Sequence, residues 1–305
     1  METIRTRLTV NIEGLEVALS NPEKVFWPDE GYTKAHLLRY YAEVSPYLLP
    51  HLADRPLVLH RFPEGIRGPS FYQKECPEYA PDWLPRVRLS SHGRPTVTYV
   101  LVADLAGLLW VVNQGAIEIH PWLSRWNAPD HPTVAVLDLD PAPPADFAEA
   151  RLLARRLGRL LAQLGLKCYP KTSGATGLHL YLPLAPRYTY AEVRRTLTAL
   201  ARWCVAAWPD LCTLERTVRR RSGRVYLDVG QNGRGKTIAS VYSVRPLPGA
   251  PVSFPLTWEE LEDEKLNPLR FNLATVPEML ARRGDIFAPV IKEEQSLDRL
   301  LAGWT

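Results

Sequence analysis

Residues Val134–Pro141 read VAVLDLDP, an apolar and β-branched run that ends in two aspartates and a proline. This pattern predicts a buried strand over Thr133–Leu139. Alternate residues of a strand point to the same face, so we expect Asp138 and Asp140 to project together. Carboxylate pairs of this kind supply the hard oxygen ligands that divalent cations prefer. The pair alone is also compatible with a strand-end turn in which an aspartate caps the next helix.

The segments after this strand alternate between helical and extended patterns. Leucines and alanines recur at helical spacing over Asp146–Leu164, and Gly165 follows as a typical helix end. A strand, a strand, a helix and a strand are then expected at Leu166–Pro170, Gly177–Leu184, Ala191–Trp208 and Arg224–Val229. The order β-α-β-β-α-β defines the split ferredoxin-like unit, which polymerase palms and RNA-recognition modules share. We therefore predict a ferredoxin/RRM-like core, although a fold alone assigns no chemistry.

A third carboxylate, Asp228, closes the last of these strands in the sequence Val225-Tyr-Leu-Asp. In the split unit the first and fourth strands are neighbours, so Asp228 should approach Asp138 and Asp140. Three acids on adjacent strands repel one another unless cations lie among them. We therefore predict that these three aspartates are catalytic and hold the metals of a two-metal phosphoryl-transfer site. The sequence does not give the register of the two strands.

The N-terminal part predicts a mixed α/β lobe. The expected elements are a helix that begins after Thr33, strands at Pro56–Arg61 and Val97–Val102, a helix near Asp104–Val112, and an aromatic loop around Phe71 and Tyr72. A linker with two prolines, residues 127–132, marks a boundary. We predict an α+β chain with an N-terminal lobe (1–130), a catalytic core (131–245) and a C-terminal extension packed on the core (246–305).

Composition and charge limit the class of protein. The hydrophobic fraction of 46% and charged fraction of 23% are ordinary for a globular protein. The four cysteines form no CxxC pair, which argues against a zinc knuckle. The N-terminus lacks an apolar signal core, and charged residues interrupt the most apolar stretch, so we expect a cytoplasmic protein with no membrane span. The net charge is only +4, but five arginines between positions 216 and 224 precede Asp228. An isolated basic run would be read as a solvated face.

A glycine-rich segment, Lys171–His179 (KTSGATGLH), joins two of the expected core strands. Glycines let backbone N–H groups approach an anion closely, and Ser173 and His179 could add donors to a triphosphate. The alternative is a glycine-rich hairpin in which His179 is an ordinary strand residue.

A second glycine-rich segment, Gly230–Thr237 (GQNGRGKT), matches the Walker A string. A genuine P-loop opens a helix whose N-terminus holds the phosphates, whereas Ile238–Pro246 reads as strand and turn. We therefore interpret the match as accidental. Arg234 and Lys236 remain candidate phosphate contacts, or else exposed residues of a turn. An ATPase would require a helix after Thr237 and hydrolysis without DNA.

Several strings occur together in one order, and they resemble the polymerase domain of bacterial DNA ligase D, in the archaeo-eukaryotic primase superfamily. The strings are Asn21–Pro28 (NPEKVFWP), Thr33-Lys34, Arg55–Arg61 (RPLVLHR), Phe71–Lys74 (FYQK), Gly115–Trp122 (GAIEIHPW), Asp138-x-Asp140, Lys171–His179, Gln231–Thr237 after Asp228, and Tyr242–Arg245 (YSVR). The resemblance covers nearly the whole chain, and so many ordered matches are far more specific than any single motif.

The resemblance implies DNA repair synthesis in non-homologous end joining by a nucleotidyltransferase that fills gaps and extends ends. Family members prefer ribonucleotides and favour manganese, so two Mn²⁺ (or Mg²⁺) ions per site are implied. The implied partners are gapped or 3′-overhang DNA with a 5′-phosphate, NTP or dNTP, the end-binding protein Ku and a separate DNA ligase. The sequence given has no ligase or nuclease segment, so we expect a stand-alone form, associated with the bacterial nucleoid.

The resemblance also implies roles for single residues. The nucleotide-binding set is His120, which would lie by the sugar, with Lys171, Ser173, His179, Arg221, Lys236 and Arg245. The DNA-binding set is Lys24 and Lys34 on the downstream 5′-phosphate, Phe71 and Tyr72 stacked on the template, and Arg61 and Arg234. Without the resemblance, the lysines would be read as surface charges and the aromatic pair as a core contact.

Two positions depart from the family pattern. His60 stands where members often carry lysine, which would make a phosphate contact there pH-dependent. Ala175-Thr176 replaces a common Gly-Lys, which removes one basic contact and leaves the backbone cradle. A non-catalytic DNA-end scaffold for a ligase is the main alternative function. It would explain the basic run and the aromatic loop but not a complete set of three acids.

Overall fold

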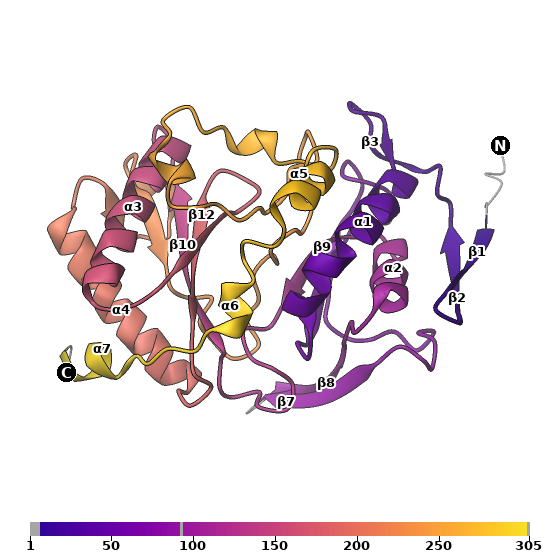
Figure 1. Cartoon of the computed structure of the whole chain (residues 1–305), viewed down its shortest axis with the longest axis horizontal. Coiled ribbons are helices and arrows are strands. Elements are labelled where there is room, and N and C mark those ends of the chain that lie inside the picture. The colour runs from indigo at the N-terminus through magenta and orange to yellow at the C-terminus, as the bar shows by residue number, and fades with distance from the viewer. Residues whose placement is uncertain (1–6, 92–93, 304–305) are drawn as a thin grey trace. The chain divides into compact units, whose positions relative to one another are not determined.

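The computed structural model describes residues 7–91 and 94–303, which form two compact units (Figure 1). The first unit comprises Met1–Trp122, Ala239–Val252 and Leu269–Asp285, and the second comprises Leu123–Ile238, Ser253–Pro268 and Ile286–Thr305. The two units therefore interleave along the chain. Residues 246–305, expected from the sequence to form one extension, contribute to both units.

The second unit is built on a five-stranded sheet. Its elements are β10 (Val134–Pro141), α3 (Phe147–Gln163), β11 (Tyr169–Thr172), β12 (Leu178–Pro183), α4 (Tyr190–Ala207), β13 (Cys212–Thr213), η1 (Val218–Arg220), β14 (Val225–Asp228), η2 (Glu260–Glu262), α6 (Pro289–Lys292) and α7 (Asp298–Gly303). The short helix η3 (Pro268–Arg270) begins at the last residue of one segment of this unit and continues into a segment of the first unit. The strand order is β11-β12-β10-β14-β13, with β13 parallel to β14 and the other pairs antiparallel. The predicted β-α-β-β-α-β core is confirmed. The two-residue edge strand β13 was not predicted, because it is too short to show a periodic pattern.

Local sequence explains why the helices of this unit begin where they do. Asp146 and Glu149 form a capping box at α3, in which the Asp146 carboxylate accepts from the Ala148 amide at 2.7 Å. Thr189 and Glu192 form the same motif at α4. The apolar face of α3 packs on β10, β12 and β14, and α3 runs alongside β10 (Figure 1). Each fully buried leucine on this face, such as Leu153, contributes roughly 1.5–3 kcal/mol.

The first unit contains a second five-stranded sheet and two packed helices. Its elements are β1 (Arg7–Ile12), β2 (Leu15–Ser20), β3 (Val25–Trp27), β4 (Tyr32–Thr33), α1 (Lys34–Leu52), β5 (Leu57–Arg61), β6 (Phe71–Gln73), β7 (Arg86–Ser91), β8 (Arg94–Val100), α2 (Leu105–Asn113), β9 (Ala116–Pro121) and α5 (Val276–Arg283). The sheet order is β6-β5-β8-β7, and β9 also pairs with β5. Helices α1 and α2 pack against each other, and α2 contacts β2 and β9. The predicted mixed α/β character and the N-cap at Thr33 are confirmed.

Two local expectations were wrong. Phe71 and Tyr72 lie in a short strand, β6, because their backbone pairs with β5 rather than forming a loop. In residues 238–246 the expected turn is present, but an isolated bridge between Val244 and Val252 takes the place of the expected strand. No helix follows Thr237 in this described segment, so the structural requirement of a P-loop ATPase is not met. Among the described residues, no helix combines the length and apolarity that crossing a membrane requires.

Candidate functional site

One row of polar side chains crosses the sheet of the second unit. Asp138 on β10 lies opposite Asp228 on β14 and, on its other side, opposite His179 on β12. His179 in turn lies opposite Lys171 on β11. Directly opposed residues share a face of the sheet, so these four side chains form a continuous row, which we call the acidic row. Like charges directly opposite each other are destabilising, and the Asp138–Asp228 pair therefore favours an added cation.

The third aspartate is paired with an arginine. Asp140 shares the face of Asp138, and its carboxylate accepts a hydrogen bond from Arg221 Nη1 at 2.7 Å. The buried Arg221 guanidinium also lies over the ring of Tyr226, 4.5 Å from its centroid, and donates to the carbonyls of Glu215 and Arg216. Arg221, expected from the resemblance to bind nucleotide, is therefore held beside the acidic row by an ion pair.

The carboxylates of Asp138, Asp140 and Asp228 are the candidate ligands of a metal ion. Asp228 Oδ1 accepts from the Gly230 amide at 2.7 Å, and Asp140 faces Arg221. With these orientations, no group of three His, Cys, Asp or Glu side chains within residues 7–91 and 94–303 is close enough to hold an ion. The register still brings all three carboxylates to one face of adjacent strands. Their oxygen chemistry is the type that Mn²⁺ and Mg²⁺ prefer.

Lys171 fixes the orientation of His179. Lys171 is fully buried, and its ammonium contacts His179 Nδ1 at 2.8 Å and the hydroxyl of Ser253. The Ser253 hydroxyl donates its own proton to the Thr172 carbonyl at 2.7 Å, so the ammonium must be the donor to Ser253. An ammonium has no acceptor, and His179 Nδ1 therefore accepts. The proton of the neutral imidazole lies on Nε2, which is 3.5 Å from Asp138 Oδ1.

The glycine-rich segment after Lys171 folds back on itself. Ser173 Oγ accepts from the amides of Ala175 and Gly177, each at 3.1 Å, and the Ser173 amide donates to the Gly177 carbonyl at 2.9 Å. A Cβ at Gly177 would lie 2.2 Å from the Leu139 carbonyl oxygen, so only glycine allows this close approach to β10. Two of the amides expected to cradle phosphate are thus partnered by Ser173.

The Walker-like segment is anchored to β10 by Asn232. The Asn232 side chain accepts from the Val136 amide at 2.9 Å and donates to the Val136 carbonyl at 2.7 Å, as a neighbouring strand would. Arg234 forms an ion pair with Asp130 at 2.6 Å, and Lys236 is exposed. No sequence pattern distinguishes Asn232, since a buried asparagine and an exposed one look alike in a loop.

Two lysines of the first unit, Lys24 and Lys34, lie near enough for their charges to interact. Lys34 is buried, and its ammonium donates to the Ser20 carbonyl at 2.6 Å. Burial, with the nearby charges of Lys24 and Arg61, lowers the pKa of Lys34 to about 8. Lys24 pairs with Glu64 at 2.7 Å and lines a cavity of about 1070 Å³ together with Ser20, Asn21 and Asn113. The lining also contains Arg7, Glu23 and Glu64, so its two acids balance its two basic residues.

The aromatic pair on β6 is exposed. Phe71 is 47% exposed and Tyr72 is 58% exposed, so the alternative of a core contact is wrong. The Arg61 guanidinium lies over the Phe71 ring at 5.2 Å, and Tyr72 stacks on His60 with ring centroids 4.0 Å apart. Exposed aromatic rings beside a cation are typical of surfaces on which nucleic-acid bases stack.

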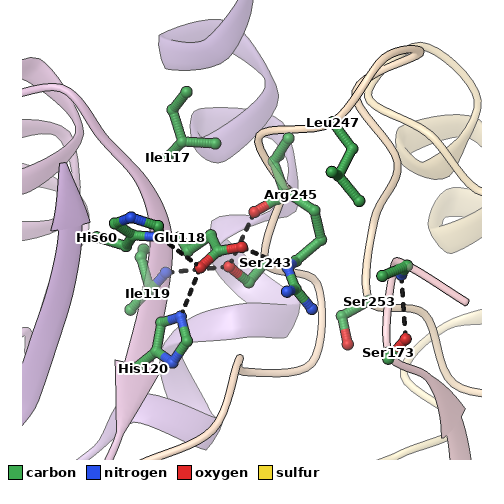
Figure 2. Close-up of polar contacts among 12 residues, drawn as sticks. His60, Ile117, Glu118, Ile119, His120, Ser173, Ser243, Arg245, Leu247 and Ser253 are labelled. Carbon is green, nitrogen blue, oxygen red and sulfur yellow. Dashed lines mark hydrogen bonds and ion pairs between the residues drawn. The ribbon is translucent and has the colours of Figure 1, made fainter. Parts of the chain in front are cut away.

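His120 and Arg245 meet at a carboxylate that the sequence analysis did not select (Figure 2). Glu118 is buried and accepts hydrogen bonds from His120, His60 and Arg245. The available signal was a single acid in the middle of the apolar strand sequence AIEIH, two residues before His120. That spacing puts both side chains on one face of a strand.

The ferredoxin-like sheet with its acidic row is the arrangement expected of the primase-polymerase class, and comparison with known families agrees. The family model described as "LigD, primase-polymerase domain" matches residues 33–287. This chain therefore belongs to the LigD primase-polymerase domain family.

Curated relatives and a solved structure show how far the similarity extends. The multifunctional non-homologous end joining protein LigD of Mycolicibacterium smegmatis is 35% identical over 288 residues, which cover 93% of this chain and 37% of that protein. The bifunctional LigD of Bacillus subtilis is 36% identical over 274 residues, which cover 90% and 44%. The chain thus spans less than half the length of these relatives. The polymerase domain of Mycobacterium tuberculosis ligase D, solved in complex with DNA, matches with a TM-score of 0.84 at 33% identity, covering 92% of this chain and 99% of that one.

Proposed function

We propose that this chain is a DNA polymerase of non-homologous end joining, which adds nucleotides to 3′ hydroxyls at DNA ends and gaps. The observation that carries the proposal is the register of β10 and β14, which sets Asp138 directly opposite Asp228 with Asp140 on the same face. Family membership and the similarity to a polymerase domain solved with DNA support it.

The three aspartates are the proposed ligands of two Mn²⁺ or Mg²⁺ ions. Such ions, when bound, activate the attacking hydroxyl and neutralise charge on the triphosphate. Asp140 must exchange its ion pair with Arg221 for a metal contact. That exchange would free the Arg221 guanidinium for the triphosphate, in keeping with its implied role as a nucleotide contact.

The proposed nucleotide contacts follow from the hydrogen bonds of His179 and from the resemblance. His179 is set to donate from Nε2 to a phosphate oxygen, because Lys171 occupies its Nδ1. Lys171 therefore acts through His179 in this proposal. The resemblance places His120 by the sugar, and Ser173, Lys236 and Arg245 by the triphosphate.

DNA is assigned to the first unit and to the loop that carries Arg234. The cavity beside Lys24, with the buried Lys34 nearby, takes the 5′-phosphate of the downstream strand. Phe71 and Tyr72 stack on template bases, with Arg61 beside them. A preference for ribonucleotides, action with Ku and a separate ligase, and a place at the bacterial nucleoid in the cytoplasm complete the proposal, all by family analogy.

An incorporation assay tests the proposal. The purified chain is incubated with labelled ribo- or deoxynucleotides, Mn²⁺ or Mg²⁺, and a 5′-phosphorylated gapped duplex. We expect metal-dependent extension that Asp228→Ala abolishes while most DNA binding remains. Asp210→Asn, an exposed acid of the same unit, is the matched control and should extend normally. Extension by the Asp228→Ala protein at the unaltered rate would refute the assignment.

A non-catalytic DNA-end scaffold is the second candidate. The exposed aromatic pair beside Arg61 favours it, because this surface would serve DNA binding without chemistry. The same assay separates the two functions, since a scaffold binds the gapped duplex and incorporates nothing with either metal.

A further inference from the structure

A buried carboxylate joins three side chains of the first unit (Figure 2). Glu118 on β9 is 2% exposed. Its Oε2 contacts His60 Nδ1 and His120 Nε2, both at 2.9 Å, and its Oε1 contacts Arg245 Nε. We call these four residues the Glu118 cluster. A carboxylate this deeply buried is tolerated only when its acceptor capacity is filled, as it is here.

The sheet and one docked segment place every member of the cluster. His60 on β5 is the direct cross-strand partner of Glu118, and His120 shares the face of Glu118 two residues further along β9. The segment that carries Arg245 is tied to the same strand. The Ile119 amide donates to Ser243 Oγ at 3.0 Å, and the Ser240 amide donates to the Ile119 carbonyl at 2.9 Å. The geometry is therefore set by backbone pairing rather than by flexible surface side chains.

Proton counting fixes the tautomers of the two histidines. Burial by itself would raise the pKa of Glu118, but hydrogen bonds from His120 and His60 and the charge of Arg245 outweigh it and hold the pKa below its usual range. The carboxylate is thus ionised near neutral pH and can only accept. Protons must therefore lie on His120 Nε2 and on His60 Nδ1. The other ring nitrogen of His60, Nε2, lies 3.1 Å from the Ser70 hydroxyl.

The nitrogen of His120 that does not contact Glu118, Nδ1, is a hydrogen-bond acceptor. Burial lowers the pKa of His120 in spite of the opposing effect of Glu118, so the ring is neutral at neutral pH. With its proton on Nε2, His120 carries a lone pair on Nδ1. Nδ1 makes no hydrogen bond to a residue in the part of the chain that the structure describes. A lone pair can accept from a hydroxyl group but cannot bind a phosphate oxygen, which is itself an acceptor.

We propose that Glu118 is a positioning residue that holds His120 as a hydrogen-bond acceptor for a sugar hydroxyl of the incoming nucleotide. The inference rests on the proposed function, which places His120 beside that sugar. It adds that recognition of the incoming nucleotide by His120 depends on a hydroxyl of the sugar. It also depends on the Glu118 carboxylate, which does not touch the substrate. Tyr72 stands edge-on to His120, with centroids 5.7 Å apart, and the ring packing supports the orientation that Glu118 imposes.

The first test is spectroscopic and needs no activity. Two-bond ¹H–¹⁵N spectra of protein labelled at its seven histidines report which ring nitrogen carries the proton, and His60→Gln and His120→Gln spectra assign the signals. We expect the Nε2–H form for His120 and the Nδ1–H form for His60 at neutral pH. A proton on His120 Nδ1, or on both its nitrogens, would overturn the proposal. Because this test uses the unaltered protein, it holds even if a Glu118 variant fails to fold.

The second test is kinetic. Single-nucleotide incorporation is measured with ATP, 2′-deoxy-ATP and 3′-deoxy-ATP, which separates the two hydroxyls that could be recognised. In Glu118→Gln the amide adds a donor where three donors already meet, so at least one contact is lost. The preference of the unaltered protein, as a ratio of kcat/KM for ATP over the disfavoured deoxy analogue, should fall about tenfold, roughly the value of one hydrogen bond. Glu43→Gln, which breaks an exposed pair with Arg39 in the same unit, is the control and should keep the preference.

The outcomes separate this inference from the proposed function. A folded Glu118→Gln protein with unchanged preferences for both analogues would overturn the positioning role. A merely structural Glu118 would lower stability and all three kcat/KM values together, and would leave their ratios unchanged. No incorporation by the unaltered protein, with the expected pair of tautomers, would instead refute the polymerase activity while the hydrogen-bonding polarity of His120 stands.

Discussion

The acidic row of the second unit and the Glu118 cluster of the first solve the same electrostatic problem in opposite ways. In the acidic row, Asp138 and Asp228 face each other across two strands, with the neutral His179 imidazole 3.5 Å from Asp138 and the Gly230 amide on Asp228. In the cluster, a single carboxylate is surrounded by His60, His120 and Arg245. The first arrangement is built for a ligand of opposite charge, whereas the second is complete without one. A region in which two carboxylates oppose each other is therefore the better candidate for metal chemistry.

The largest expected effect concerns metal binding at the acidic row. Asp138→Ala should lower nucleotide incorporation at least about a thousandfold, because several kcal/mol of charge stabilisation disappear with the metal. Saturating Mn²⁺ should raise the Tm of the unaltered protein, with about 2.7 kcal/mol of stabilisation at a hundredfold excess over Kd. It should leave the Tm of Asp138→Ala unchanged. Thermal melts with and without Mn²⁺ check this, with Asp210→Asn as the control. An equal Tm shift in Asp138→Ala would place the metal elsewhere.

Truncation of Glu118 should lower the stability of the protein in a way that does not depend on metal. Glu118→Ala leaves buried donors without their acceptor, so we expect a loss of about 3–5 kcal/mol in the free energy of unfolding. Added Mn²⁺ should not restore this loss. Urea titration measures it, and Glu43→Ala should change stability by less than about 1 kcal/mol, because that pair is exposed. A Glu118→Ala protein as stable as the unaltered one would remove the contrast between the two regions.

A smaller effect is expected at the cavity that Lys24 lines. The double variant Lys24→Ala, Lys34→Ala should reduce the preference for a 5′-phosphate on gapped DNA by about tenfold, since two phosphate contacts are lost. The slope of log affinity against log salt should become less steep by up to about two units. Binding titrations with phosphorylated and unphosphorylated duplexes measure both quantities. An unchanged preference would remove these lysines from the phosphate site.

The smallest effect is a pH dependence at Lys34, whose pKa is lowered from 10.5 to about 8 in the folded chain. Between these values the unfolded chain binds more protons, so this group makes the protein more stable as pH rises through the window. The 5′-phosphate preference should change in the opposite direction and weaken above about pH 8, as Lys34 loses its charge. Binding at pH 7 and pH 9 tests this, and Lys34→Arg should abolish the change because an arginine stays charged.

Short-range sequence patterns are sufficient to predict much of the ferredoxin-like core. The apolar run before Asp138, the helical spacing of 146–164 and the glycine after it each depend on neighbours within a few residues. The capping boxes at Asp146 and Thr189 are equally local. The β-α-β-β-α-β order follows from them, and the topology rule then brings the strand of Asp228 beside that of Asp138.

The amino-acid order is enough to predict the succession of elements, the face on which Asp138 and Asp140 project, and the family to which the matching strings point. The pairing of Asp138 with Asp228, the ion pair of Arg221 with Asp140 across 81 positions, and the contact of Arg245 with Glu118 across 127 become visible only in the folded chain. The tertiary structure also decided that Phe71 and Tyr72 form an edge strand rather than a loop. The physical reason is that strand register and long-range ion pairs depend on how distant segments pack, and no periodicity along the chain encodes that distance.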